Sequence, residues 1–270
     1  MMASVMSNLA LVGAGVSMIA ATPAAAAPLS PVDSWTIDYS ETQCAAHRTF
    51  TADGRKVALA LRPAIDGSSY EVTLAESDAD FQLPNQVAGK ADFGGGAAKA
   101  WVLKHRDPAT NNQIHRFRVP ASQIAGAQAG SEISFSAPAY RAQFGNVNVG
   151  AAVRALSTCL EDLRTFWNAS SDVSRPASPR ENVEALLKPA NHEDSEMWGG
   201  VKGSARYVLF IDPAGKLAGC EAVSDDASPI LALLGCDILR QRAQFTPALD
   251  QEGKPVRDVI TTSEVRWRFG

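Results

Sequence analysis

The sequence predicts an α+β protein of two domains: an N-terminal antiparallel sheet with a covering helix at its C-terminal end, then a smaller strand–strand–helix–strand (ββαβ) domain. Three observations lead to this fold class. Short segments of alternating apolar and polar residues recur between residues 35 and 135, as in half-buried strands. A single apolar stripe with helical spacing follows at 149–167. A stretch rich in Ser, Pro and Asp, 168–180, then precedes a second group of strands and a helix.

The length and composition describe a globular protein. The chain has 270 residues, of which 46% are apolar and 20% charged, values typical of folded rather than disordered chains. Lys and Arg number 25 against 29 Asp and Glu, a formal charge of −4. A protein that binds nucleic acid through its phosphates normally has a basic excess, so we expect no nucleic-acid partner.

Residues 1–26 resemble a secretory signal peptide. An apolar run from Leu9 to Ala21 precedes Thr22-Pro23 and four alanines, and small residues with this spacing are typical of a cleavage site. We expect cleavage after Ala26 and a periplasmic mature protein that does not span the membrane. Because no Lys or Arg precedes the apolar run, the alternative is an uncleaved N-terminus that anchors the chain in the inner membrane.

We expect the first domain to comprise residues 27–168. Its helix covers Val149 to Trp167, where the apolar stripe includes residues 153, 156, 159, 160 and 163. This helix closes the domain and covers the sheet. The predicted strands of that sheet are 35–39, 56–61, 70–74, 100–105, 114–119 and 132–135.

Four cysteines are present, two in each half of the mature chain: Cys44 and Cys159, then Cys220 and Cys236. In an exported protein this distribution favours one disulfide per domain, although four cysteines allow three pairings. Cys159 lies on the apolar stripe of the helix, where it can meet Cys44 near the first strand. No Cys-x-x-Cys spacing occurs, so neither a zinc site nor a redox pair is indicated.

Residues 169–195 are expected to form a linker, and 196–270 the second domain. Strands are predicted at 204–211 and 216–223, on either side of a turn, Asp-Pro-Ala-Gly. A helix follows from Ile230 to Ala243, and a last strand from Val256 to Phe269.

Residues 200–269 resemble the TonB C-terminal domain. The resemblance is carried by Arg-x-Arg-x-x-Phe-x-Pro-Ala at 240–248, by Asp-x-x-Gly-Lys-Pro-Val at 250–256, and by the final alternating strand. It implies a ββαβ fold, and the pair Cys220 and Cys236 is similar to versions of the domain that bridge the second strand to the helix. The sequence lacks the basic-flanked anchor and long Pro-rich spacer of such proteins, so we do not expect coupling to an inner-membrane motor.

The resemblance also implies the capture of an extended peptide by β-augmentation, in which the peptide pairs with an open sheet edge. The partner implied is a segment of an outer-membrane transport protein or another envelope protein of a Gram-negative cell. The edge belongs to the last strand, and the residues along one face of it are Val259, Thr261, Ser263 and Val265. The alternative is an ordinary core strand whose edge is covered by the linker.

No catalytic site, metal or cofactor is predicted. The histidines have no metal-ligand spacing, and no Gly-x-Ser-x-Gly motif occurs. The run His-Glu-Asp-Ser-Glu at 192–196 could ligate a metal, but such a run is typical of a solvated loop. Residues 104–106 and 115–118 form a basic hairpin that could contact anionic headgroups, although a solvated strand pair that protects a sheet edge is the simpler interpretation.

Together these observations favour a non-enzymatic periplasmic protein that binds a peptide. Two alternatives belong to other classes: a freestanding envelope structural or stress protein in which the C-terminal unit only stabilises the chain, and an exported hydrolase. Recovery of an outer-membrane transporter with the protein separates the first interpretation from the second, and an activity screen tests the third.

Overall fold

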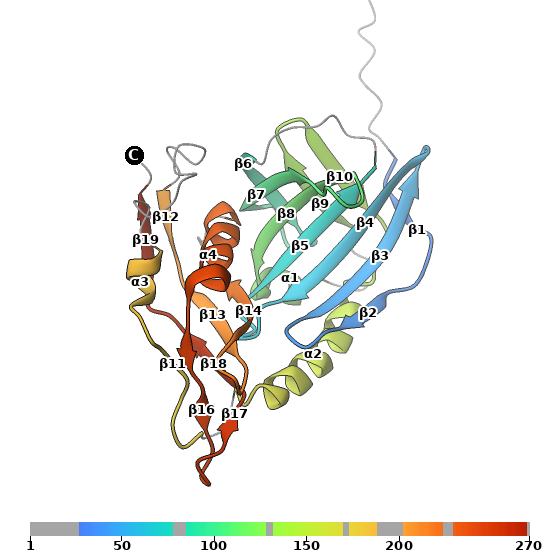
Figure 1. The fold of residues 1–270 in the computed structure, drawn as a ribbon. Coiled ribbons are helices and arrows are strands. Elements are labelled where there is room, and N and C mark those ends of the chain that lie inside the picture. Colours follow the sequence, from blue (N-terminus) through green and yellow to red (C-terminus); the bar gives the residue numbers. More distant parts are fainter. Residues whose placement is uncertain are drawn as a thin grey trace, which may run out of the picture.

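The computed structural model describes residues 27–77, 85–127, 132–169, 173–187, 202–223 and 229–268. It consists mainly of antiparallel strands (Figure 1). The predicted signal peptide and the run 192–196 lie outside the described residues. The strands of the first half are β1 (Ser30–Pro31), β2 (Thr36–Tyr39), β3 (Cys44–Ala52), β4 (Arg55–Pro63), β5 (Ser69–Glu76), β6 (Asn85–Asp92), β7 (Ala98–Arg106), β8 (Gln113–Pro120), β9 (Ile133–Ala137) and β10 (Tyr140–Phe144).

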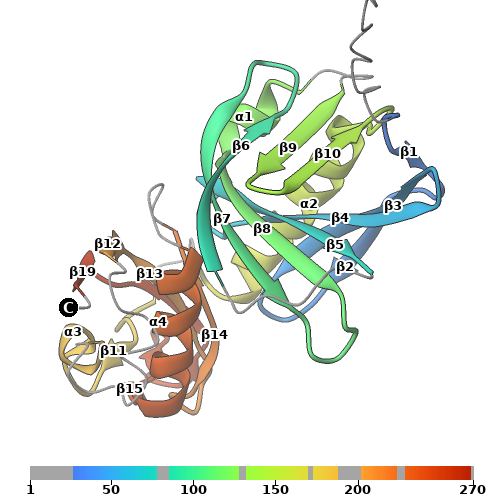
Figure 2. The same ribbon diagram turned by 90° about the horizontal axis from the view of Figure 1, so that it is seen from above.

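These ten strands form one large sheet in the order β1-β3-β4-β5-β8-β7-β6-β9-β10, with β2 beside β1 on β3. The sheet curls until it is nearly closed and barrel-like (Figure 2). Leu29, directly before β1, forms a bridge with Phe144 at the end of β10. Its N–H donates to the carbonyl oxygen of Gln143 (2.7 Å), and its carbonyl oxygen accepts from Gly145 N–H (2.9 Å). The two ends of the sheet are therefore joined by backbone hydrogen bonds.

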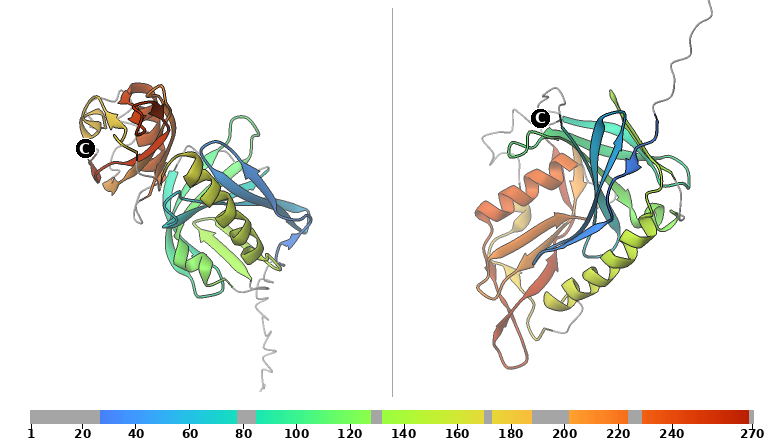
Figure 3. Two further views of the ribbon diagram at one scale, coloured as in Figure 1. Left: turned by 90° about the horizontal axis from the view of Figure 1, so that it is seen from below. Right: turned by 90° about the vertical axis from the view of Figure 1, so that its right-hand side faces the viewer.

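Two helices accompany the large sheet, the short α1 (Ala121–Ala125) and the long α2 (Val149–Phe166). The helix α2 packs against β2, β3 and β4 (Figure 3). Its buried residues include Ala152, Leu156 and Leu163, because the apolar stripe faces the sheet. The predicted disulfide Cys44–Cys159 is confirmed and joins β3 to α2.

The second half contains one long helix and short strands in four small sheets. A three-stranded sheet in the order β14-β13-β18 is the largest of them. The predicted disulfide Cys220–Cys236 is confirmed and joins this sheet to the long helix. The elements are β11 (Ser178–Pro179), α3 (Val183–Leu186), β12 (Lys202–Ala205), β13 (Tyr207–Ile211), β14 (Leu217–Ala222), α4 (Pro229–Arg242), β15 (Phe245–Thr246), β16 (Ala248–Leu249), β17 (Pro255–Val256), β18 (Asp258–Thr261) and β19 (Val265–Arg268).

The predicted α+β fold class is wrong. In place of a modest sheet with a covering helix and a small ββαβ domain, the chain is mostly antiparallel β-structure dominated by the ten-stranded sheet. The strands β1, β3, β6 and β10 were not predicted. Small and polar residues hide the period of two in β3 and β6, and β1 has only two residues, whereas β10 does alternate and was missed. The last predicted strand, 256–269, is divided into β17, β18 and β19.

The two halves share a hydrophobic core. Trp167, at the end of α2, is buried and contacts Phe210 of β13 edge-to-face, with 5.3 Å between ring centroids. Its indole Nε1–H donates to the carbonyl oxygen of Glu41. Val208 and Val223 from the second half belong to the same cluster. Burial of these side chains fixes the second half against the first.

A glycine in α4 allows the helix to approach β13 closely. A Cβ atom at Gly235 would collide with the ring and hydroxyl of Tyr207, which is fully buried and donates its Oη–H to the carbonyl oxygen of Leu231 (2.8 Å). We expect Gly235→Ala to lower the free energy of unfolding by about 1–3 kcal/mol, because overpacking outweighs the gain in helix propensity.

Urea denaturation measures this loss, and Gly150→Ala is the matched control. A Cβ atom at Gly150, in α2, would be 3.5 Å from Arg154, an ordinary contact, so the control should gain up to about 1 kcal/mol. Equal effects of the two substitutions would contradict the close approach.

Candidate functional site

One candidate site is the outer edge of β18. The inner side of this strand pairs with β13, with Ile260 opposite Leu209. In the part of the chain that the structure describes, no strand pairs with the outer side. Thr262 N–H donates to the carbonyl oxygen of Tyr207 on β13 (2.9 Å). Because backbone groups alternate along a strand, the N–H and C=O of Thr261 point to the outer side.

A groove of about 580 Å³ runs along this edge, between residues 179–184 and 260–263. The segment on its far side is joined to β18 at both ends. Asp258, at the start of β18, accepts from Ala177 N–H through Oδ2 (2.8 Å). Ser263, after the strand, donates its Oγ–H to Glu184 Oε1 (2.6 Å). The chain therefore flanks the edge without pairing with it.

The predicted edge residues take different positions. Thr261 and Ser263 line the groove. Val259 is also in β18, but its side chain packs against the first hydrophobic cluster. Val265 belongs to β19, pairs with Ala205 and is buried. The structure thus brings two of the four side chains into the groove and directs the two valines into the protein.

A second candidate site lies between the two halves, on the outer face of the large sheet. The register places Arg62 on β4 opposite Glu71 on β5, and Glu71 opposite Arg118 on β8. Arg62 Nη2 is 3.1 Å from Glu71 Oε2, and Arg116 Nη1 is 4.0 Å from Glu71 Oε1. One carboxylate therefore pairs with two guanidinium groups.

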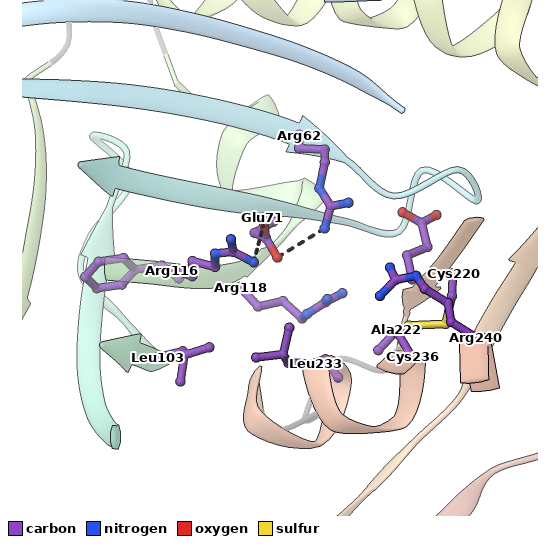
Figure 4. Close-up of a pocket in the computed structure, with 13 residues that line it drawn as sticks. Arg62, Glu71, Leu103, Arg116, Arg118, Cys220, Ala222, Leu233, Cys236 and Arg240 are labelled. Carbon is purple, nitrogen blue, oxygen red and sulfur yellow. Dashed lines mark hydrogen bonds and ion pairs between the residues drawn. A yellow bond between two sulfur atoms is a disulfide. The ribbon is translucent and has the colours of Figure 1, made fainter. Parts of the chain in front are cut away.

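The second half covers this row of charges and leaves a pocket of about 120 Å³ (Figure 4). Strand β14 contributes Glu221, which is buried and accepts from Ile65 N–H through Oε1 (2.6 Å). The helix α4 contacts β6, β7 and β8 and contributes Leu233 and Arg240. Arg118 extends into the pocket and donates from Nη1 to Ser69 Oγ (3.3 Å).

Burial and charge act in opposite directions on these groups. Burial alone would raise the pKa of Glu71, but the guanidinium groups of Arg62, Arg116 and Arg118 hold that pKa below its usual value. Burial raises the pKa of Glu221, although the positive charges of Arg62 and Arg118 act to lower it. Burial also lowers the pKa of Arg118, although Glu71 opposes it. Glu71 is thus held ionised, while burial disfavours the charged forms of Glu221 and Arg118.

The interpretation of the basic hairpin as a solvated edge is wrong. Both β7 and β8 lie inside the sheet and are paired on both sides. Lys104 and His115 are buried, and burial together with the Lys104 charge lowers the pKa of His115 to about 4. Arg116 and Arg118, which belong to the same hairpin, face the pocket because they alternate with the buried residues of β8.

Within the described ranges, no group of three or more His, Cys, Asp and Glu side chains could hold a metal ion. No helix of that part of the chain is long and apolar enough to cross a membrane. No family model, curated protein or solved structure matches this chain. The function must therefore follow from the geometry of the groove and of the pocket.

Proposed function

We propose that the protein binds an extended peptide by strand addition at the outer edge of β18. The observation that carries the proposal is that this side faces a groove and pairs with no described strand. A peptide there would accept from and donate to outward backbone groups such as those of Thr261. The resemblance of residues 200–269 to the TonB C-terminal domain supports the same edge.

The dimensions of the groove suit a short strand. Its volume of about 580 Å³ falls within the range of roughly 300–1,000 Å³ typical of ligand pockets. The four residues of β18 span about 13 Å at roughly 3.3 Å per residue. About four residues of peptide therefore fit along the edge, where Val259 N–H already donates to Asp258 Oδ1 (2.8 Å) and Thr261 supplies the outward N–H. The segment 179–184 limits the size of the peptide side chains on the far side of the groove.

The proposal includes a place of action and a partner. Two disulfides are compatible with export to an oxidising compartment, and we assign residues 1–26 as a signal peptide and the periplasm as the destination. The partner is a segment of an outer-membrane or other envelope protein. The protein acts as a binding protein and catalyses no reaction.

Two proline substitutions test the edge. Thr261→Pro removes an outward N–H and should abolish binding of peptides selected from a random ten-residue library, with little loss of stability. Thr262→Pro removes the bond to Tyr207 O, and also the hydroxyl that accepts from Tyr207 N–H (3.0 Å). It should lower the free energy of unfolding by about 3 kcal/mol.

Fluorescence anisotropy of the labelled peptide and urea denaturation provide the two measurements. Thr261→Val keeps the N–H and should bind as the wild type does. If both prolines destabilise equally, β18 is paired on both sides. If the selected peptides still bind Thr261→Pro, they bind elsewhere; either outcome would contradict the proposal.

A further inference from the structure

The pocket between the two halves has more positive than negative side chains. Its lining includes four guanidinium groups, those of Arg62, Arg116, Arg118 and Arg240, but two carboxylates, those of Glu71 and Glu221. Arg240 has a partner outside the lining, Asp237, at 2.7 Å. Arg62 and Arg116 share Glu71.

Arg118 makes no close ion pair in the described part of the chain, although the charges of Glu71 and Glu221 act on its pKa. Its hydrogen-bond acceptor is a neutral hydroxyl, Ser69 Oγ, and no carboxylate of the described chain lies within ion-pair distance of it. Next to it, Arg116 Nε is buried without a hydrogen-bond partner in the same part of the chain. A buried donor without an acceptor costs free energy, so an anion that accepts from Arg116 Nε and lies beside the Arg118 charge would be favoured.

Part of the pocket wall is apolar. Leu103 of β7 is the cross-strand neighbour of Arg116, and Leu233 of α4 faces the pocket from the helix (Figure 4). Leu233 is 40% exposed, so part of its side chain is accessible to a ligand. The cavity of about 120 Å³ is several times what a water molecule needs, roughly 10–15 Å³. The pocket thus offers both charged and apolar surface to a ligand.

We propose that this pocket binds a small organic anion, with its oxyanion head on Arg118 and Arg116 and its apolar part against Leu103 and Leu233. The head group would supply an acceptor for Arg116 Nε and a negative charge within ion-pair distance of Arg118. No residue of the pocket lines the groove along β18, so this site is separate from the proposed peptide site.

The cost of Arg118 to the fold supports the same assignment. Burial lowers its pKa, which means that the folded protein disfavours the charged form relative to the unfolded chain. We therefore expect Arg118→Gln to be at least as stable as the wild type while it loses the anion.

Two sulfonates of equal charge are suitable probes, because neither titrates near neutral pH. Calorimetry of the full mature chain should show benzenesulfonate binding about tenfold more tightly than methanesulfonate, since the ring buries apolar surface that the methyl group does not. Arg118→Gln should weaken both ligands at least about tenfold. Arg154→Gln, on the exposed face of α2, is the matched control and should change neither affinity.

Leu233→Ser tests the apolar part of the site independently of the arginines. The side chain is partly exposed, so the fold should tolerate the change, and the preference for benzenesulfonate should disappear while methanesulfonate binds as before. Failure of both sulfonates to bind, equal affinities in the wild type, or wild-type affinities in Arg118→Gln and Leu233→Ser would each overturn the proposal. Because peptide binding at β18 is measured separately, either proposal can fail without the other.

Discussion

Replacement of both Cys44 and Cys159 by alanine is expected to lower the free energy of unfolding by about 4–5 kcal/mol. The disulfide joins residues 115 apart in sequence, and in the chain-entropy model a loop of that length confines the unfolded chain strongly. It also holds α2 against β3, so its loss should expose the apolar face of that helix. Urea denaturation of the double variant measures the loss.

The second disulfide is the natural comparison. Cys220 and Cys236 are 16 residues apart, for which the same model gives about 3 kcal/mol. The double alanine variant at these positions should therefore be the more stable of the two. If instead the variant without Cys220–Cys236 were the less stable, packing around α4 and not the loop length would determine how much each disulfide stabilises the protein.

Glu71→Gln should cost about 3 kcal/mol of folding free energy. The carboxylate is the shared partner of Arg62 and Arg116, and its side chain is 20% exposed. Removal of one partner from a largely buried ion pair leaves the other charge uncompensated, which is far more costly than the loss of a surface pair. Asp237→Asn, which breaks an exposed pair with Arg240 (both side chains about half exposed), should cost less than about 1 kcal/mol.

The pH dependence of the Glu71→Gln effect has a defined sign. The pKa of Glu71 is lower in the folded protein than its ordinary value of 4.5. The stabilisation is therefore complete above pH 4.5 and is lost as the pH falls through the lower folded pKa. Wild type and variant should converge in stability in that acid range. A difference that stays constant down to pH 2 would contradict the role assigned to the carboxylate.

The sequence predicts best where one element has a strong period. The distribution of the four cysteines favoured one disulfide in each half, and the stripe of α2 placed Cys159 toward the sheet, where Cys44 lies. The family resemblance indicated the pair Cys220 and Cys236 as well, and both pairings are confirmed. Such local patterns survive folding because the core face of a helix depends on spacing and not on which strands it meets.

In β6, one of the strands that were not predicted, close packing requires a small residue. Gly89 in β6 illustrates this, since a Cβ atom there would collide with Val102 and lie 2.6 Å from the carbonyl oxygen of Ser136. Small residues are needed where neighbouring strands and side chains crowd the backbone, and they remove the apolar signal by which strands are recognised. Without β3 and β6, the size of the sheet and its closure could not be predicted.

The pocket is a product of long-range register. Arg62, Glu71 and Arg118 each occupy the outward position of an alternating strand, and such positions are normally solvated. They form a row only through the pairing of β4, β5 and β8, and the row is buried only because β14 and α4 lie over it. None of this is encoded within a short window of sequence. The Arg116–Arg118 pair in the basic hairpin was the one local signal.

The bridge between Leu29 and Phe144 has a consequence for the order of folding. During synthesis the residues around Leu29 emerge among the first of the described chain, yet their partners on β10 emerge only after nine strands have been made. Closure of so long a loop is slow, since its entropy must be lost before the new contacts compensate for it. The curled sheet should therefore close late, and until then β10 is exposed along one side to pairing with other chains.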